Sequence, residues 1–411
     1  MKRILYIDLS PSPGGSVISL FQLVSHLDRT LAQSLVVLSA LNTFDRFDSV
    51  DVPILRVRTP QWEPRLGTLV DRVRASRVGN EMREQPERAG WWHFLGDLRR
   101  YGRDVWPVVP PLRRIIRDFQ PDLIHLNDGI QMSRHGALAA RLSRKPAICH
   151  YRAFDPPLPI DRWLVTPGID GWVFISQAVA EVQFAAMGHP RCWQVIPNAI
   201  DLQEFDGPVD IAAVRASLGV PADVPLVGMI GRVAPWKGQL VFVEALAQVS
   251  QEHPTVHGVI VGLAEELDGP GYADQVRQRA GELGLGERLR MVGHRGDVAQ
   301  VLAAVDCVAH CSVRPEPFGR VIIEGMAASK PVVASSAGGA TEIVTDGVDG
   351  LLTPPGDASA LAHALTRLLS DPAECTRIGQ AGRRTVEQRY QIGAHVAAIQ
   401  AFYERVLAPK T

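Results

Sequence analysis

The chain is short of cysteine and of net charge, and each shortage excludes a class of protein. Its 411 residues include five cysteines, with no CxxC pair and no metal-ligand spacing, so neither a disulfide framework nor a zinc site is expected. The formal net charge of −1 argues against a nucleic-acid-binding protein. Few, scattered thiols suit a reducing compartment, and we expect a cytoplasmic protein.

The sequence also lacks long apolar runs. No stretch approaches the ~18 consecutive apolar residues needed to span a bilayer. The opening residues, MKRILYIDLS, combine two positive charges with a short apolar run, as a signal peptide does. Asp8 interrupts that run, however, and no small-residue cleavage site follows. We therefore interpret this stretch as a first β-strand.

Short apolar segments alternate with longer amphipathic ones along most of the chain. The short segments are typical of strands buried on both faces, and the longer ones have the spacing of helices. This alternation predicts an α/β protein with parallel sheets, and its two series predict two Rossmann-like domains. The predicted strands are RILYIDL, SLVVLSA, DLIHLN, PAICHY, WVFIS and WQVIP in the first series and PLVGMIG, HGVIVG, LRMVG, DCVAHC, PVVASS and GLLTP in the second.

The two series are separated by residues 198–224, which are rich in aspartate and proline and contain no predicted strand. We place the domain boundary near residue 205, which gives domains 1–205 and 206–390. Residues 391–411 contain a strongly periodic helix with no strand after it, and such a helix must bury its apolar stripe. We expect it to pack back on the first domain.

Residues 41–115 interrupt the alternation, and we expect a variable helical insertion there. The overlapping segment 56–117 contains 14 arginines and seven acidic residues. One interpretation is a solvated helical surface. The other is peripheral contact with the inner membrane or with an acidic or lipid-linked acceptor, since cationic helices with interfacial aromatics favour anionic membranes. The aromatic residues concerned are Trp62, Trp91, Trp92 and Trp106.

Two cations follow the first predicted strand of the second domain. In open α/β sheets, ligands bind beyond the carboxyl ends of the strands, and there PLVGMIG is followed by RVAPWKG. Arg232 and Lys237 suit an anion, because arginine makes forked hydrogen bonds to phosphate and lysine supplies a mobile point charge. Gly231 and Gly238 allow close approach of the backbone. The alternative is a pair of ordinary surface cations.

The stretch RPEPFGRVIIEGMAAS supplies a second anion-binding feature. Gly319 precedes a predicted helix, whose first N–H groups and dipole favour a bound anion. Glu324 lies in the second turn of that helix, where a buried carboxylate is costly unless it is paired, and Glu316 lies in the loop before it. A diphosphate near the helix start, with hydroxyl-bearing groups on either side, would satisfy both glutamates. The alternative is a structural glutamate paired with a core arginine.

These stretches resemble a known family. RPEPFGRVIIEGMAASKPVVASSAGGATEIVTDGVDGLLTPPGD is similar to the E-x7-E region of glycosyltransferase family 4, whose members are retaining enzymes of GT-B architecture that use nucleotide sugars. VGMIGRVAPWKGQ resembles the family's diphosphate-binding G-R-x4-K loop. PDLIHLNDG and AICHYRAF resemble strand ends of its first domain, and VFISQAVAE and VIPNAID its domain-linking elements. The resemblance covers nearly the whole chain outside 41–115 and implies two Rossmann-like domains whose parallel sheets face each other across a cleft.

For the donor, the resemblance implies that Arg232 and Lys237 hold the diphosphate, that Glu324 binds the ribose and that Glu316 binds the transferred sugar. Further donor contacts are implied at Gly293, His294 and Arg295 for the base and at Pro317, Phe318, Gly319 and Arg320 for the sugar and phosphates. The implied catalytic residues are His150, Glu316, Arg232 and Lys237.

In the first domain, the resemblance implies that Gly14 and Gly15 lie near the diphosphate and that His150 hydrogen-bonds the donor sugar. A plain strand-to-helix turn is the alternative for the two glycines. His150 ends a predicted strand, where ligands are expected, whereas we interpret His125 as a buried strand residue. The candidates for acceptor contacts are Asn127, Asp128 and Arg152. For Asn127 and Asp128 the alternative is strand-end capping.

Three positions depart from the family's usual pattern. Gly325 stands in place of alanine, Ser329 in place of glycine and Ala199 in place of glycine. A glycine within a helix costs ~1 kcal/mol relative to alanine, so we expect Gly325 to relieve crowding. We expect Ser329 to suit a helix C-terminus less well than glycine would.

The implied activity is transfer of a sugar, with retention, from a UDP- or GDP-sugar to a hydroxyl of a glycan, lipid-linked or small-molecule acceptor in polysaccharide or glycoconjugate biosynthesis. No DxD-type acidic motif stands beside the phosphate site, so we expect no essential metal and no other cofactor. The alternatives are a sugar-nucleotide epimerase of the same architecture and a non-catalytic partner subunit that binds nucleotide sugar. A dinucleotide dehydrogenase is disfavoured, because the first strand leads into SPSPGGS and not G-x-G-x-x-G.

Overall fold

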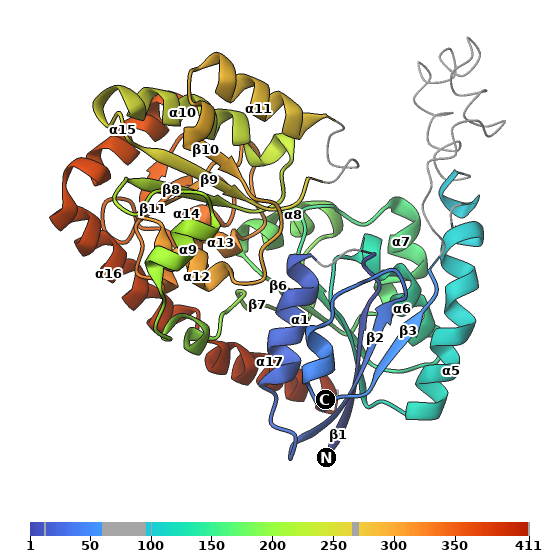
Figure 1. Ribbon diagram of the computed structural model, residues 1–411. Helices are drawn as coiled ribbons and strands as arrows, with labels where there is room; N and C mark the ends of the chain where they lie inside the picture. Colours follow the sequence, from blue (N-terminus) through green and yellow to red (C-terminus); the bar gives the residue numbers. More distant parts are fainter. Residues whose placement is uncertain (12–13, 60–95, 100, 265–270, 410–411) are drawn as a thin grey trace, which may run out of the picture. The chain divides into compact units, whose positions relative to one another are not determined.

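The computed structural model describes residues 1–11, 14–59, 96–99, 101–264 and 271–409 (Figure 1). The chain forms two compact units. The first comprises residues 1–175, 180–196 and 398–411, and the second comprises residues 176–179 and 197–397. The second unit thus takes up the chain from residue 197, a little before the position near 205 indicated by the sequence, because Ile200 already pairs with Gln391.

The first unit contains a seven-stranded parallel sheet of order β3-β2-β1-β4-β5-β6-β7. Its strands are β1 (Lys2–Asp8), β2 (Ala32–Ser39), β3 (Ile54–Val57), β4 (Leu123–Leu126), β5 (Ala147–Tyr151), β6 (Gly171–Phe174) and β7 (Trp193–Val195). The sequence analysis missed β3, which lies within the 41–115 segment expected to be helical and pairs with β2. It is a short edge strand with one buried residue, Val57, so it lacks the apolar run by which the other strands were identified.

Helices cover both faces of this sheet, as the apolar strands predict. On one face, Gly136 of α6 (Ile130–Leu142) approaches so closely that a Cβ on it would lie 2.6 Å from Leu126 Cδ2. On the other face, Tyr403 of α17 (Ile392–Leu407) hydrogen-bonds His125 and packs its ring edge-on against the imidazole. Neighbouring residues of a strand point to opposite faces, so β4 contacts both layers. The last part of the chain therefore lies in the core of the first unit.

Among the described residues, further helices of the first unit include α1 (Gly15–Ser25), α5 (Val109–Phe119), α7 (Pro159–Leu164) and most of α8 (Gln177–Met187). α5 lies alongside α6 (Figure 1) and is preceded by Trp106. The predictions for Trp62, Trp91 and Trp92 lie outside the described residues.

The second unit contains a six-stranded parallel sheet of order β10-β9-β8-β11-β12-β13. Its strands are β8 (Leu226–Ile230), β9 (His257–Val261), β10 (Leu289–Met291), β11 (Cys307–His310), β12 (Val332–Ser335) and β13 (Leu351–Thr353). Its helices include α9 (Ile211–Ser217), α10 (Gln239–Glu252), α11 (Tyr272–Glu282), α12 (Val298–Ala304), α13 (Arg320–Ala327), α14 (Ala340–Ile343), α15 (Ala358–Ser370) and α16 (Pro372–Arg389). Helices α10, α11 and α15 lie on one face of the sheet, and α9, α12 and α13 on the other (Figure 1).

Two departures from the family pattern have clear structural settings. A Cβ on Gly325 would lie 2.9 Å from Val332 Cγ2 and 3.1 Å from Val308 Cγ2, so glycine lets α13 approach β11 and β12 closely. Ser329 has φ of 57°, in the left-handed region that glycine adopts at lower cost. Both expectations drawn from the sequence at these positions are therefore confirmed.

The prediction of two Rossmann-like α/β domains with parallel sheets is confirmed by the two sheet orders. Within the part of the chain that the structure describes, we find no helix whose length and apolar character would let it traverse a bilayer.

Candidate active site

Both sheets have the topological feature that marks ligand sites in open α/β folds. At one point in each sheet, the strands that follow in the chain are added to one side of a central strand and then to the other side of it. Ligands bind beyond the carboxyl ends of the two neighbouring strands at this switch point. These strands are β1 and β4 in the first unit and β8 and β11 in the second. Most residues singled out from the sequence lie in the loops that follow them.

In the second unit, glycines bring the loops after β8, β9 and β10 together. Gly262 approaches Gly231 so closely that a Cβ on Gly262 would overlap the Gly231 carbonyl. The N–H of Gly262 also donates to Gly293 O at 2.8 Å. The structure therefore places Arg232 and Gly293, both predicted donor-binding residues, on loops that meet at one edge of the sheet.

The loop after β8 is held against the end of β11. Gly238 follows the short 3-10 turn η6 (Pro235–Lys237) with φ of 80°, and a Cβ on it would overlap the Cys311 carbonyl. The N–H of Val313 donates to Trp236 O at 2.9 Å. This close approach requires glycine at 238, and it places Lys237 beside the loop that carries Glu316.

Lys237 and Glu316 form the centre of the candidate site. The lysine ammonium pairs with Glu316 Oε1, and His310 Nε2 hydrogen-bonds Glu316 Oε2. The Lys237 and Glu316 side chains are 18% and 5% exposed. A carboxylate buried to this degree is costly unless its charge is compensated. Here each of its oxygens has a partner.

His310 is a site residue that the sequence analysis missed. Burial, reinforced by the nearby Lys237 ammonium, lowers the pKa of His310 to about 3, so its ring is neutral at physiological pH. Because Glu316 can only accept, Nε2 carries the ring proton. Nδ1 is buried with no hydrogen-bond partner among the described residues, and protonating it would leave a buried donor unsatisfied. His310 ends β11, so the strand-end rule could have found it.

Helix α13 begins beside the Lys237–Glu316 pair. Its N-cap, Gly319, has φ of 97°, and a Cβ on it would lie 3.5 Å from Glu316 Oε2. The backbone of Glu316 is fixed by a bridge to Gly338 and accepts a hydrogen bond from Gly339 N–H at 2.8 Å. The structure thus brings together three features predicted separately: the cation, the loop glutamate and the helix start.

The loop between Glu316 and α13 has further anchors. Pro317 O accepts a hydrogen bond from Ser176 Oγ at 2.6 Å. The Phe318 ring is buried and packs edge-on against Tyr390, with 5.9 Å between ring centroids. These contacts fix the backbone that the resemblance assigns to the sugar and phosphates.

Glu324 has a partner on its own helix. Its Oε1 accepts from Arg320 Nη2 at 3.1 Å, in an i,i+4 pair of partly buried side chains. The alternative drawn from the sequence is a pair with a core arginine, whereas Arg320 is a partly buried residue of the same helix. Ribose binding by Glu324 stays a prediction. A carboxylate accepts several hydrogen bonds, so the pair leaves room for hydroxyl donors.

Arg232 is exposed. Like Lys237, it lies near the indole ring of Trp236. The Arg232 guanidinium carbon lies 6.0 Å from the indole ring centroid, and Lys237 Nζ lies 4.4 Å from it. Both cations therefore lie within cation–π range of one ring.

The segment predicted to contact the base is held by local interactions. Arg295 Nε and Nη2 donate to Asp297 at 2.8 and 2.6 Å. This hydrogen bonding raises the pKa of Arg295 and lowers the pKa of Asp297. His294 is exposed. The role of both residues at a base stays a prediction.

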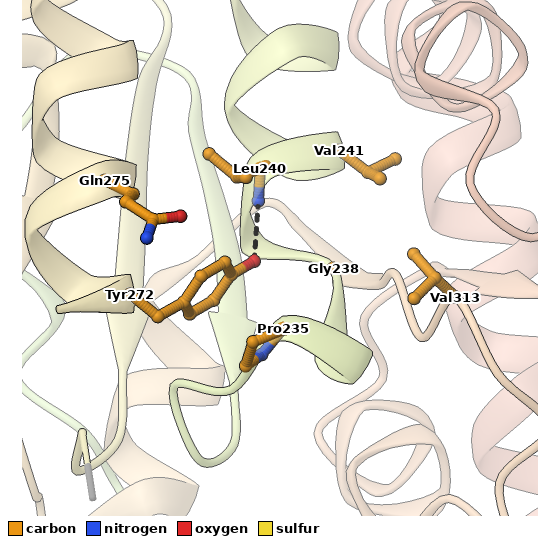
Figure 2. Close-up of a pocket in the computed structure, with 7 residues that line it drawn as sticks. All are labelled: Pro235, Gly238, Leu240, Val241, Tyr272, Gln275 and Val313. Carbon is orange, nitrogen blue, oxygen red and sulfur yellow. Dashed lines mark hydrogen bonds between the residues drawn. The ribbon is translucent and has the colours of Figure 1, made fainter. Parts of the chain in front are cut away.

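A cavity of about 430 Å³ is lined in part by Pro235 of η6 and by Gly238. Figure 2 shows its lining residues. Tyr272 crosses the cavity, and its hydroxyl accepts from Leu240 N–H at 3.3 Å. No lining residue is charged, so the cavity does not suit a diphosphate. It is lined by Pro235, Gly238, Leu240, Val241, Tyr272, Gln275 and Val313.

In the first unit, a buried polar network follows β1, β4 and β5. Asn127 Nδ2 donates to Asp8 Oδ2 at 2.7 Å, and Arg152 Nη2 donates to Asn127 Oδ1 at 3.0 Å and to His150 Nδ1 at 3.1 Å. All four side chains are buried. The structure therefore brings Asn127, His150 and Arg152 together, and the roles predicted for them at a ligand stay predictions. The sequence analysis did not single out Asp8.

The glycine loop of the first unit leads into α1. Gly14 is the N-cap of α1, and no heavy atom lies within 4 Å of a Cβ built on it. Gly15 is the first residue of the helix. Within the described part of the chain no contact requires glycine at 14, and the proximity of the pair to a diphosphate stays a prediction.

Asp128 is a partly buried carboxyl beside this network. Burial, followed by the neighbouring Asp8, raises the pKa of Asp128 to about 7, against the opposing effects of Gly129 N–H and Arg152. The folded protein therefore binds this proton more tightly than the unfolded chain. It follows that the free energy of unfolding falls as the pH rises through the interval between the ordinary carboxyl pKa and about 7.

We expect Asp128→Asn to remove this part of the pH dependence. Between pH 5 and pH 8 the wild type should lose about 2 kcal/mol of unfolding free energy relative to the variant, because only its folded state carries the elevated pKa. Urea denaturation at several pH values measures the difference. Parallel curves for the two proteins would contradict the assignment.

Searching the described residues for a metal site gives no group of three or more His, Cys, Asp or Glu side chains that could hold an ion. That the protein needs no metal stays a prediction.

Two family models match successive parts of the chain. "Glycosyltransferase Family 4" matches residues 13–204, and "Glycosyl transferases group 1" matches residues 210–385. Together they span both units.

Curated relatives and a solved structure agree with these matches. The lipopolysaccharide core biosynthesis glycosyltransferase LpsD of Rhizobium meliloti is 30% identical over 320 residues, which cover 77% of this chain and 85% of that protein. LpsE of the same bacterium is 33% identical over 225 residues, 54% of this chain and 60% of the relative. The crystal structure of Anabaena Alr3699/HepE with UDP-glucose gives a TM-score of 0.78 at 28% identity, with 98% of this chain and all of the other covered.

The fold and these relatives define a glycosyltransferase of GT-B architecture. The chain belongs to glycosyltransferase family 4, group 1.

Proposed function

We propose that the protein transfers a sugar from a nucleoside-diphosphate sugar to an acceptor hydroxyl, with retention of configuration. The pairing of Lys237 with Glu316 at the start of α13 carries the proposal. An ammonium and leading helix N–H groups suit a diphosphate, and an adjacent carboxylate suits sugar hydroxyls. UDP is the nucleotide we favour, because the similar Alr3699/HepE has been crystallised with UDP and UDP-glucose. A GDP-sugar is the second candidate.

Catalysis is proposed to depend on charge stabilisation. As the bond between the sugar's anomeric carbon and the diphosphate breaks, negative charge develops on the leaving phosphate. Arg232, Lys237 and the first N–H groups of α13 are placed to stabilise it, and such electrostatic effects are usually the largest in catalysis. The acceptor oxygen bonds to the anomeric carbon on the same face, and its proton passes to the leaving phosphate. No metal and no further cofactor take part in this proposal.

The other predicted roles enter as parts of the same proposal. His150 and the pair Gly14 and Gly15 would act near the donor, and Asn127, Asp128 and Arg152 near the acceptor. The acceptor is a glycan, lipid-linked or small-molecule hydroxyl, and polysaccharide or glycoconjugate biosynthesis is the expected setting, because LpsD and LpsE are named for lipopolysaccharide core biosynthesis. A cytoplasmic location accords with a nucleotide-sugar donor.

The donor can be identified by thermal shift with UDP-, GDP- and ADP-sugars. One nucleotide series should raise Tm selectively, since a ligand at 100 times its Kd stabilises by about 2.7 kcal/mol. The bound donor is then incubated with candidate acceptors, and the anomeric configuration of the product is read by NMR. No change in Tm with any nucleotide sugar would contradict the assignment of the donor site. A product of inverted anomeric configuration would contradict a retaining mechanism.

Two alternatives give different products. A sugar-nucleotide epimerase would convert the donor without any second sugar or acceptor. A non-catalytic partner subunit would show the thermal shift but no turnover. The charged pair at the centre of the site favours a working enzyme over the partner subunit.

We also propose that the first unit contacts an anionic membrane through a surface we call the basic groove. This groove, about 770 Å³, lies between α5 and the end of α6. Trp106, on its rim, is 57% exposed, and Trp163, whose carbonyl accepts from Arg141, is 78% exposed. Clustered cations beside exposed tryptophans favour anionic bilayer surfaces. The cations are Arg113, Arg114, Arg117, Arg141, Arg144 and Lys145.

Vesicle sedimentation tests the basic groove. The wild type should bind vesicles containing phosphatidylglycerol but not pure phosphatidylcholine, and less at high salt. Replacing Arg114, Arg117 and Arg144 by alanine should weaken binding by at least about tenfold, since each cation contributes about 1 kcal/mol. The matched control replaces the exposed cations Arg277, Arg367 and Arg377 of the second unit. Equal binding by the two triple variants would exclude the groove.

A further inference from the structure

The carboxylate of Glu316 has two partners of different kinds, one on each oxygen. Lys237 pairs with Oε1, and His310 Nε2 donates to Oε2. The first partner is a cation on a flexible four-carbon stem, and the second is a neutral ring. Because the two partners differ in mobility and charge, they can have different roles when a donor binds.

His310 is the fixed partner. It is the last residue of β11, and its backbone pairs in register with Ala334 of β12. Its carbonyl accepts from Ser335 Oγ at 3.2 Å, and Ser312 Oγ lies 3.3 Å from its Nε2. The side chain is 3% exposed. A ring held by the sheet and enclosed by packing keeps one orientation when a ligand enters.

Lys237 is the partner of Glu316 that must also bind another group, the donor diphosphate. The proposed function requires its ammonium to contact the donor diphosphate, which carries more charge than one carboxylate. As the ammonium turns toward the diphosphate, Glu316 loses compensation on Oε1 while remaining buried. His310, the partner on Oε2, does not move and therefore keeps the Glu316 carboxylate oriented toward the donor sugar. Because that partner is uncharged, it does not compete with Lys237 for the diphosphate.

We propose that His310 is a positioning residue: its Nε2–H holds the Glu316 carboxylate toward the donor sugar while Lys237 is released to the diphosphate. This inference rests on the proposed function and adds a residue to it. The inference assigns two interactions of the donor to different residues. Binding of the diphosphate depends on Lys237, and binding of the sugar depends on the orientation of the Glu316 carboxylate.

Three variants test the hydrogen bond by its geometry. His310→Gln can place an amide N–H close to the position of Nε2, whereas His310→Asn is too short and His310→Leu has no donor. Binding of UDP and of UDP-glucose is measured by calorimetry on the full chain, and kcat and KM are measured for transfer. The matched control is His395→Gln, since His395 is also a buried histidine of the second unit, bonded to the Pro197 carbonyl.

The expected result is selective for the sugar. His310→Leu and His310→Asn should bind UDP within about threefold of wild type yet lose about tenfold or more in affinity for UDP-glucose relative to UDP, with a lower kcat. His310→Gln should restore most of both losses. The kcat–pH profile should keep its shape in all variants, because His310 moves no proton.

Several outcomes would overturn the inference. Equal loss of UDP and UDP-glucose binding would indicate a structural role, as would three variants that behave alike. Unchanged discrimination in His310→Leu would show that Glu316 needs no such partner. A wild type that binds neither nucleotide nor nucleotide sugar would instead refute the proposed function, so the two failures are distinguishable.

Discussion

Lys237→Ala is expected to lower kcat by about 10²- to 10³-fold. The ammonium pairs with Glu316, whose carboxylate lies beside the N-cap residue of α13, Gly319. Removing one preorganised group that stabilises developing charge costs about this much. UDP affinity should fall as well, because the diphosphate is present in the product. Single-turnover kinetics and calorimetry measure the two effects.

The control for Lys237→Ala is Arg277→Ala in the same unit. Arg277 forms an exposed pair with Asp274, at 60% and 81% side-chain exposure, and such surface pairs contribute little to stability. Both variants should give the circular dichroism spectrum of the wild type. Normal turnover in Lys237→Ala would remove the phosphate assignment.

Glu316→Gln should separate transfer from nucleotide binding. The amide is similar in shape but lacks the charge, so it cannot hold the sugar hydroxyls as a carboxylate does, and kcat/KM should fall by about 10²-fold or more. UDP binding should be retained or become tighter, because Lys237 loses its internal counter-ion. A fall in kcat/KM together with an unchanged or higher affinity for UDP is therefore the result that identifies Glu316 as a sugar-binding residue.

Glu387→Gln is the matched control for this variant. Glu387 pairs with Arg383 on α16 at 43% exposure, and we expect near-normal transfer. Weaker UDP binding in Glu316→Gln, in proportion to its loss of activity, would argue that Glu316 organises the whole loop instead of binding the sugar.

The sequence predicts which second-unit residues come together because the parts of this candidate site are local. The cations of the loop after β8 and the stretch from Glu316 to Glu324 each lie within a short segment, and the strand-end rule assigns both segments to one edge of the sheet. The alternation of apolar strands and helices likewise predicts both parallel sheets.

What the sequence does not reveal depends on contacts between segments. The place of His310 at the end of a strand can be inferred from the sequence, but its contact with Glu316 cannot. That contact depends on the turn at Gly238 and the bridge at Gly338, which help to bring Lys237 and Glu316 to its ring. In the same way, Asn127 is a plausible ligand by position, but its side chain bonds Asp8 and Arg152. The missed strand β3 lies at a sheet edge, where partial burial removes the apolar signal.

The C-terminal helix α17 has a consequence for synthesis on the ribosome. Residues 398–409 belong to the first unit, and Tyr403 among them packs against His125 in its core. Those residues leave the ribosome only after the whole second unit has been translated. The first unit, although most of it is synthesised first, can therefore complete its core only after the second unit has been made. Until then the face of β4 that bears His125 lacks its contact with Tyr403.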